Sequence, residues 1–209
     1  MYISKLHLDK RKRDTAAALW DRGVLHSAIE GCAEGDRPHN LWRLEPDNGV
    51  LLIVSRDIPY LGDLQNRFGN SKMSPKTLEY GRYIDTVKNG NVLRFMIEVN
   101  PVINSKKGCG GNGKDIPLNI VRTKNQPFSA KDWMIQKLKE NGASVINVKD
   151  IHHDTVGIVK KDMRIPLFTV TYSGIIRVED EDAVKNAMRK GIGGKKTYGC
   201  GLLTVAGIR

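Results

Sequence analysis

Cysteine is scarce in this chain of 209 residues, which contains only Cys32, Cys109 and Cys200. An odd number of widely separated cysteines excludes a full set of disulfides and any Cys-x-x-Cys zinc pair, and it is typical of a protein from the reducing cytoplasm. His152 and His153 are adjacent, so on a strand their side chains would point to opposite faces. We therefore interpret both as surface residues and predict no metal site.

Long apolar runs and aromatic residues are also lacking. No run approaches the roughly 18–20 apolar residues of a membrane helix, and residues 1–8 alternate instead of forming a signal-peptide core. We therefore expect a cytoplasmic protein without a membrane partner. Aromatic residues make up only 6% of the chain, and no Lys/Arg-Gly-Phe-x-Phe run is present. This composition argues against single-stranded RNA stacked on a sheet of exposed aromatic rings.

Positive charge, in contrast, is abundant. The 34 lysines and arginines outnumber the 23 acidic residues, which gives a formal net charge of +11. A charge of this size attracts nucleic acid or an anionic membrane surface, and the absence of a basic amphipathic helix with a broad apolar face favours nucleic acid. With so few aromatic rings, duplex RNA held through its phosphates fits the composition best.

The most distinctive stretch is a glycine-rich loop at residues 191–201, with five glycines in eleven positions. A helix is predicted before it at residues 182–190, and a strand is predicted after it at residues 202–205. No acidic residue follows Asp182, so the loop lies in a basic tail. We interpret it as an anion-binding loop, the alternative being a flexible turn, and expect RNA contacts from its central residues, Gly193, Gly194, Lys195 and Lys196.

This loop matches neither of the familiar nucleotide-binding motifs. A Walker loop runs from strand to helix and requires a glycine before the Lys-Ser/Thr pair, whereas Lys195 precedes Lys196 and Thr197 here. A dinucleotide fingerprint requires a glycine three residues after Gly193, where the chain has Lys196. We therefore predict no cofactor.

The order of predicted elements indicates a fold that occurs twice. Residues 1–88 contain strands at 2–8, 41–45, 49–55 and 76–80, a helical region at 15–30 interrupted at Gly23, and a helix at 59–68. Residues 89–209 contain strands at 91–100, 143–148, 166–178 and 202–205, and helices at 129–139 and 182–190. Each half reads βαββαβ, so the sequence predicts two tandem ferredoxin-like (RRM-like) domains.

An insertion at residues 102–118 interrupts the second unit after its first strand. It is rich in glycine and contains Lys106, Lys107 and Lys114. A glycine-rich surface loop is often without a partner, but in a basic protein of this fold we expect these lysines to contact RNA.

His26 is the candidate for proton transfer. Leu25 and Ile29 share one face of the predicted helix, and His26 lies about 100° to the side, at the border of that face. Histidine is the side chain that most readily gains and loses a proton near neutral pH, although an ordinary half-buried histidine has the same pattern. The densest acidic run, at residues 179–182, opens a helix, where capping and the helix dipole account for it.

Several of these features together resemble one known family. They are the N-terminal Met1-Tyr2-Ile3-Ser4-Lys5, the Leu25-His26 pair, Asn100-Pro101 followed by residues 114–118, and the glycine-rich loop with Cys200-Gly201-Leu202-Leu203. The chain is similar to the CasE family, the endoribonucleases that process CRISPR repeats in type I-E Cascade complexes. The resemblance spans the whole chain, and its most specific part is the glycine-rich loop.

The resemblance implies a metal-independent endoribonuclease of antiviral defence. Such an enzyme binds the repeat hairpin of precursor CRISPR RNA, cuts at the 3′ base of the stem by attack of a 2′-OH, and stays on the mature guide RNA beside other Cascade subunits. By its place in the motif, His26 is then the catalytic histidine, and Lys196 matches the lysine of the family's glycine loop. A metal-dependent nuclease is disfavoured.

The chain departs from the family pattern at Gly23. Relatives tend to carry a tyrosine three residues before the histidine, so the second catalytic group is missing, dispensable or supplied from elsewhere. The alternative to an active nuclease is therefore a subunit that holds the same RNA hairpin without cutting it, or cuts it slowly.

Overall fold

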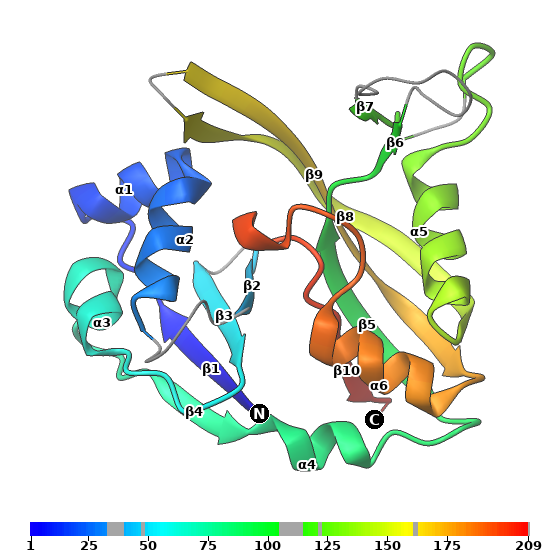
Figure 1. The fold of residues 1–209 in the computed structure, drawn as a ribbon, viewed down its shortest axis with the longest axis horizontal. Coiled ribbons are helices and arrows are strands. Elements are labelled where there is room, and N and C mark those ends of the chain that lie inside the picture. Colours follow the sequence, from blue (N-terminus) through cyan, green and yellow to red (C-terminus); the bar gives the residue numbers. More distant parts are fainter. Residues whose placement is uncertain (33–39, 47–48, 105–114, 121–122, 161–162, 209) are drawn as a thin grey trace.

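The computed structural model describes residues 1–32, 40–46, 49–104, 115–120, 123–160 and 163–208. Two lobes lie side by side and are joined at one end by a short helix, α4 (Tyr80–Asp85), as Figure 1 shows. Among the described residues no helix is both long enough and apolar enough to cross a membrane.

The N-terminal lobe is one four-stranded antiparallel sheet in the order β2-β3-β1-β4, with its helices between β1 and β2 and between β3 and β4. This is the strand order of a ferredoxin-like unit. Its elements are β1 (Tyr2–His7), α1 (Arg13–Trp20), α2 (Arg22–Glu30), β2 (Leu41–Leu44), β3 (Val50–Ser55), α3 (Gly62–Phe68) and β4 (Lys76–Glu79).

The C-terminal lobe repeats the topology, with its sheet in the order β10-β5-β9-β8. The tandem ferredoxin-like fold expected from the sequence is therefore confirmed. The elements of the C-terminal lobe are β5 (Val92–Val99), β6 (Val102–Asn104), β7 (Asp115–Pro117), α5 (Ala130–Glu140), β8 (Ala143–Lys160), β9 (Met163–Val178), α6 (Glu181–Lys190), the 3₁₀ turn η1 (Lys196–Tyr198) and β10 (Thr204–Gly207).

Local capping explains where several helices begin. Ser129 and Asp132 form the predicted capping box of α5, in which each side chain accepts a hydrogen bond from the other residue's backbone N–H. The predicted interruption at Gly23 is wrong. The chain breaks at Asp21, whose extended backbone and side-chain bond to the Gly23 N–H (2.8 Å) start α2, so that Gly23 lies inside that helix.

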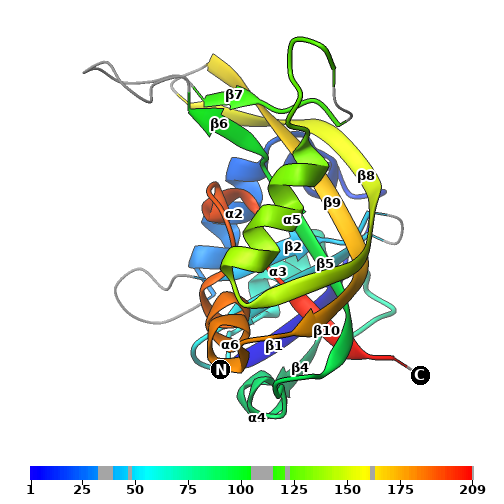
Figure 2. The same cartoon turned by 90° about the vertical axis from the view of Figure 1, so that its right-hand side faces the viewer.

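The β8–β9 hairpin is far longer than the predicted strands. β8 was expected to end at residue 148, yet pairing continues from Ala143↔Val178 to Lys160↔Met163, with two register irregularities on β8. Figure 2 shows the resulting curve of the two strands. The far end of the hairpin packs on the N-terminal lobe: Gly157 bridges to Asp21, and the Arg164 guanidinium stacks over the Trp20 ring at 3.6 Å.

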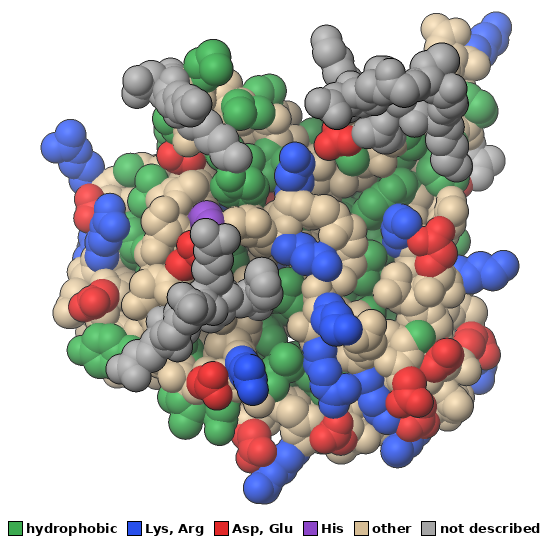
Figure 3. All heavy atoms as spheres, in the orientation of Figure 1, with side chains coloured by type: hydrophobic (Ala, Val, Ile, Leu, Met, Phe, Trp, Pro, Cys, Tyr) green, Lys and Arg blue, Asp and Glu red, His purple; other side chains and the backbone are tan. Residues whose placement is uncertain are grey.

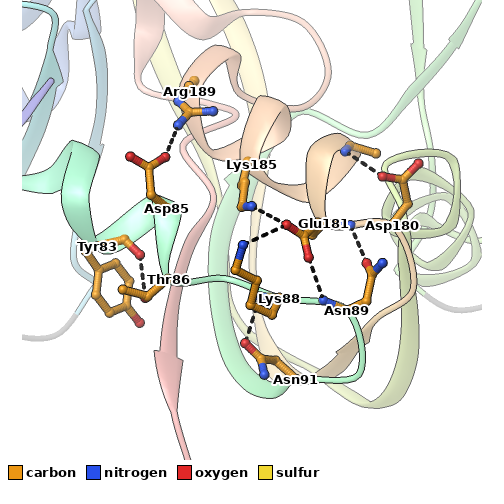
Figure 4. A network of polar contacts seen from close by, with 11 residues as sticks. Tyr83, Asp85, Thr86, Lys88, Asn89, Asn91, Asp180, Glu181, Lys185 and Arg189 are labelled. Atoms are coloured by element: carbon orange, nitrogen blue, oxygen red, sulfur yellow. Dashed lines mark hydrogen bonds and ion pairs between the residues drawn. The ribbon is translucent and has the colours of Figure 1, made fainter.

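A polar network holds α6 against α4 and the segment that leads into β5 (Figure 4). Glu181 pairs with Lys185 (2.6 Å) and Lys88 (3.1 Å), and these partners lower its pKa to about 2. Asp180 caps α6 through the Ala183 N–H. The acidic run before α6 therefore has the capping role expected from the sequence, together with ion pairs.

Candidate RNA-processing site

His26 lies on α2 between the core and the surface. Leu25 and Ile29 are almost fully buried, while 22% of the His26 side chain is exposed. The predicted position of this histidine at the border of the apolar face is therefore confirmed. A polar side chain here is held by a packed helix and still reaches solvent.

Two ionisable neighbours flank the imidazole. The Glu30 carboxylate lies one turn along α2, with Oε1 3.5 Å from His26 Nε2. The Tyr198 ring approaches from the C-terminal lobe, with ring centroids 5.9 Å apart and planes at 70°. This edge-to-face contact means that the surroundings of His26 are built by both lobes.

The glycine-rich loop brings Tyr198 to this position. α6 ends at Lys190 and is capped by Gly191. The chain then forms the turn η1, where the carbonyl of Thr197 accepts a hydrogen bond from the Trp42 indole N–H (3.2 Å). Gly199 follows with φ +88°, and a Cβ there would lie 2.6 Å from the Trp42 ring. Only glycine allows both this backbone conformation and this close approach.

A cleft of about 340 Å³ opens between the lobes beside His26. Its walls come from α2, the start of β2, the end of α6 and η1. The charged and polar side chains in it are His26, Glu30, Asn40, Arg189, Lys190, Lys196 and Thr197. Three of these carry a positive charge and one a negative charge, and Figure 3 shows further lysine and arginine side chains over the same face. The cleft suits a phosphodiester backbone.

His26 also lines a second cleft, of about 450 Å³. This cleft is lined by Asp21, Gly23, Ser27, Arg67, Ile158 and Tyr198, among others. His26 therefore lines both clefts, and its neighbour Tyr198 lines the second.

Behind His26, a buried ionic joint connects the lobes. Arg22, one turn before His26 on α2, donates to Glu98 of β5 (Nη2 to Oε1, 2.9 Å), and both side chains are at most 6% exposed. Burial raises the pKa of Glu98, an effect that the Arg22 guanidinium opposes. Arg43 of β2 donates to the carbonyls of Met96 (2.8 Å) and Leu202 (3.0 Å) in the other lobe. This joint connects α2 and β2 of the N-terminal lobe to β5 and to Leu202, the residue that follows the glycine-rich loop.

The structure brings only part of the predicted RNA-contacting set together. Lys196 lines the cleft with His26, whereas the Lys195 Nζ lies 4.0 Å from Asp115 of β7. Gly193 and Gly194 are exposed in the same loop. The predicted contacts Lys106, Lys107 and Lys114 lie outside the described residues, although the flanks of their insertion pair as β6 and β7.

Several residues at the site were not singled out by sequence reasoning. Arg189 and Lys190 belong to a tail already recognised as basic, but their place beside His26 depends on the packing of α6. Glu30 could have been found, since it follows His26 by one helical turn. Tyr198 and Trp42 carry no such signal, because they meet His26 and the glycine-rich loop only through tertiary contacts.

Comparison with known proteins identifies the family. The model of a family described as "CRISPR associated protein" matches residues 1–207, which is nearly the whole chain. The chain belongs to this family of CRISPR-associated proteins. The resemblance to CasE proteins seen in the sequence is thereby confirmed, and this chain is a CRISPR-associated protein with the two-lobed fold described above.

Its relatives cover the full length of the chain. The CRISPR-associated endoribonuclease Cse3 of Thermus thermophilus is 27% identical over 226 residues, which span 99% of this chain and 100% of the relative. A structure of Thermus thermophilus Cse3 bound to an RNA representing a pre-cleavage complex has a TM-score of 0.77 at 22% identity, covering 98% of each chain. Cas6e from Escherichia coli K-12 has a TM-score of 0.65 at 23% identity, covering both chains completely.

Among the residues that the structure describes, no group of three or more His, Cys, Asp or Glu side chains is arranged to hold a metal ion. Cys32 and Cys200 are buried free thiols, and burial raises the pKa of each. Both therefore pack as small apolar side chains.

Proposed function

We propose that this protein is the endoribonuclease that processes precursor CRISPR RNA, with His26 as its catalytic histidine and without a metal ion. The observation that carries this proposal is the cleft between the lobes, whose walls His26 shares with Lys196, Arg189 and Lys190. The family and the Cse3 relative, which is named as an endoribonuclease, support the same activity.

The chemistry follows from these side chains. The 2′-OH just upstream of the cut attacks the neighbouring phosphate, which leaves a cyclic phosphate on one fragment and a 5′-hydroxyl on the other. This step needs proton transfer at both oxygens and positive charge for the negative phosphorane. His26 transfers a proton, and the lysine and arginine side chains of the cleft stabilise the charge.

The substrate in this proposal is the repeat hairpin. The net charge of +11 and the basic side chains on the cleft face favour a duplex held through its phosphates. Solved relatives include Cse3 bound to a 19-nucleotide RNA and chains of CRISPR RNA-guided surveillance complexes. By analogy, the protein works in the cytoplasm and remains on the mature guide RNA as a Cascade subunit.

The second candidate is a subunit that holds the hairpin without cutting it, and Gly23 favours this candidate. Gly23 lines the cleft beside His26 but supplies no functional group there. A protein of this kind would bind the repeat as tightly as the nuclease does and leave it intact.

A cleavage assay separates these functions. The repeat hairpin from the same locus, labelled at its 5′ end, is incubated with excess protein in EDTA, beside an identical hairpin with 2′-deoxyribose before the cut. We expect one cut at the base of the stem of the ribose substrate and none in the deoxy substrate, with equal binding of both. Binding without any cut would support the second candidate. Cleavage that stops in EDTA, or that continues on the deoxy substrate, would contradict the mechanism.

A further inference from the structure

The reaction proposed above needs two proton transfers, and the structure suggests the partner of His26. One group must accept the proton of the attacking 2′-OH, and another must supply a proton to the departing 5′ oxygen. Both must lie close together, because they act on one phosphodiester. This inference rests on the proposed nuclease function.

Most polar side chains around His26 have other roles. The Asp21 carboxylate accepts hydrogen bonds from the backbone N–H groups of Gly23 (2.8 Å) and Val159 (3.1 Å), so it caps α2 and anchors the β8–β9 hairpin. The Ser27 hydroxyl donates to the Gly23 carbonyl (3.0 Å). The lysine and arginine side chains are cations suited to holding phosphate oxygens.

Glu30 and Tyr198 are the two ionisable side chains that flank the imidazole, the first with Oε1 at 3.5 Å from Nε2 and the second at a ring-centroid distance of 5.9 Å. The Glu30 side chain is 47% exposed. A carboxylate has no proton to give, whereas a phenol carries a hydroxyl proton that it can donate. The unprotonated nitrogen of a neutral imidazole can accept a proton. The chemistry therefore favours the histidine as the base and the tyrosine as the acid.

Three contacts of Tyr198 and of the residue before it fix the position of the tyrosine. Its ring meets the His26 ring edge-to-face, at a centroid distance of 5.9 Å. It packs on a small apolar cluster of the C-terminal lobe that includes Ile158 and Cys200. The backbone carbonyl of the preceding residue, Thr197, accepts a hydrogen bond from the Trp42 indole N–H. A side chain fixed in this way can act at a set position, as general acid catalysis requires.

We propose that the Tyr198 hydroxyl is the general acid and His26 the general base of the cleavage. The His26 imidazole takes the proton of the 2′-OH as the 2′-oxygen–phosphorus bond forms. The bond from phosphorus to the 5′ oxygen then breaks, and that oxygen keeps the electron pair and receives the phenolic proton. Solvent returns a proton to the tyrosinate and removes one from the imidazolium, so the cycle balances.

The test combines Tyr198→Phe with two substrates. One is the natural repeat hairpin, and the other has sulfur in place of the 5′ oxygen at the cut. On the natural hairpin we expect the single-turnover rate of Tyr198→Phe to fall about a hundredfold or more, with hairpin affinity unchanged. On the sulfur substrate the variant should stay within about threefold of the wild type, because a thiolate leaves without a proton. His26→Ala should be slow on both substrates, since the 2′-OH still needs a base.

The control is Tyr60→Phe, which removes the same hydroxyl from a tyrosine that is 71% exposed and lies in neither cleft, and should leave both rates unchanged. If Tyr198→Phe cleaves the natural hairpin at the wild-type rate, Tyr198 is not the general acid. An equal loss on both substrates would overturn it as well, because it would show a structural effect. If the wild type cuts neither substrate, the proposed nuclease function itself fails.

Discussion

The seam between the two lobes has a closed side and an open side, and α2 contributes to both. On the closed side, Arg22 meets Glu98 with almost no exposure to water. On the open side, one helical turn later, His26 faces a cleft with Lys196 and Arg189. The same helix thus supplies a buried ion pair for assembly and an accessible imidazole for chemistry.

The charged side chains on the two sides differ in their exposure to water, which changes how strongly they interact. In the closed joint, removal of one partner leaves a buried charge unpaired or leaves several acceptors without a donor. The free energy of unfolding then falls by about 3–5 kcal/mol. In the open cleft, each cation is screened by water and salt, so its loss weakens RNA binding and leaves the fold nearly unchanged. Substitutions on the closed side should therefore reduce stability, and those on the open side should reduce function.

Arg43→Ala should have the largest effect on stability. Arg43 is 1% exposed and donates to two carbonyls of the other lobe, to the Glu45 carboxylate and to the Thr204 hydroxyl. We expect the free energy of unfolding to fall by about 3–5 kcal/mol in urea denaturation. The matched control is Arg67→Ala, which removes a half-exposed arginine paired with Asp14 and should cost less than about 1 kcal/mol. Equal losses would contradict the distinction between the joint and the surface.

Gly199→Ala should disturb the connection between the joint and the cleft. The new Cβ would meet the Trp42 ring at 2.6 Å, in a backbone conformation that disfavours side chains, so we expect a loss of about 1–3 kcal/mol. Since the loop also carries Lys196 and Tyr198, cleavage should slow as well. Gly194→Ala is the control for stability, because a Cβ there meets nothing within 4 Å. A stable Gly199→Ala protein would show that the loop is not set by this contact.

Lys196→Ala should have the smallest effect on the fold and a clear effect on RNA. We expect an unchanged melting temperature, weaker hairpin binding, and a decrease of about 1 in the slope of log affinity against log salt. Lys139→Ala, on α5 and outside the cleft, should preserve both the affinity and the slope. An equal change in the two variants would mean that RNA does not enter the cleft beside His26.

The sequence was sufficient to predict the paired topology because its signals are local. The capping box at Ser129 and Asp132, the alternation in β5 and the helix–loop–strand order around residue 191 each reflect neighbouring residues. The side of α2 on which His26 lies follows from the same helical periodicity.

The remaining features depend on contacts between distant segments. The outer part of β8 is polar and reads as a loop, and it is a strand because β9 pairs with it and because its end docks on Asp21 and Trp20. Tyr198 and His26 are far apart in the chain and meet only once the lobes are assembled. The break at Asp21 instead of Gly23 was predictable from the capping preference of aspartate.

The role of His26 is tested most directly by the single-turnover rate of His26→Ala on the cognate repeat hairpin in EDTA. His26 belongs to the open side of the seam, so this variant should retain the wild-type melting temperature and hairpin affinity. Its cleavage rate should fall by a factor of about 10²–10⁴, the contribution of a positioned acid–base group. Cleavage at the wild-type rate by a stable His26→Ala protein that binds the hairpin normally would contradict the assignment of the site.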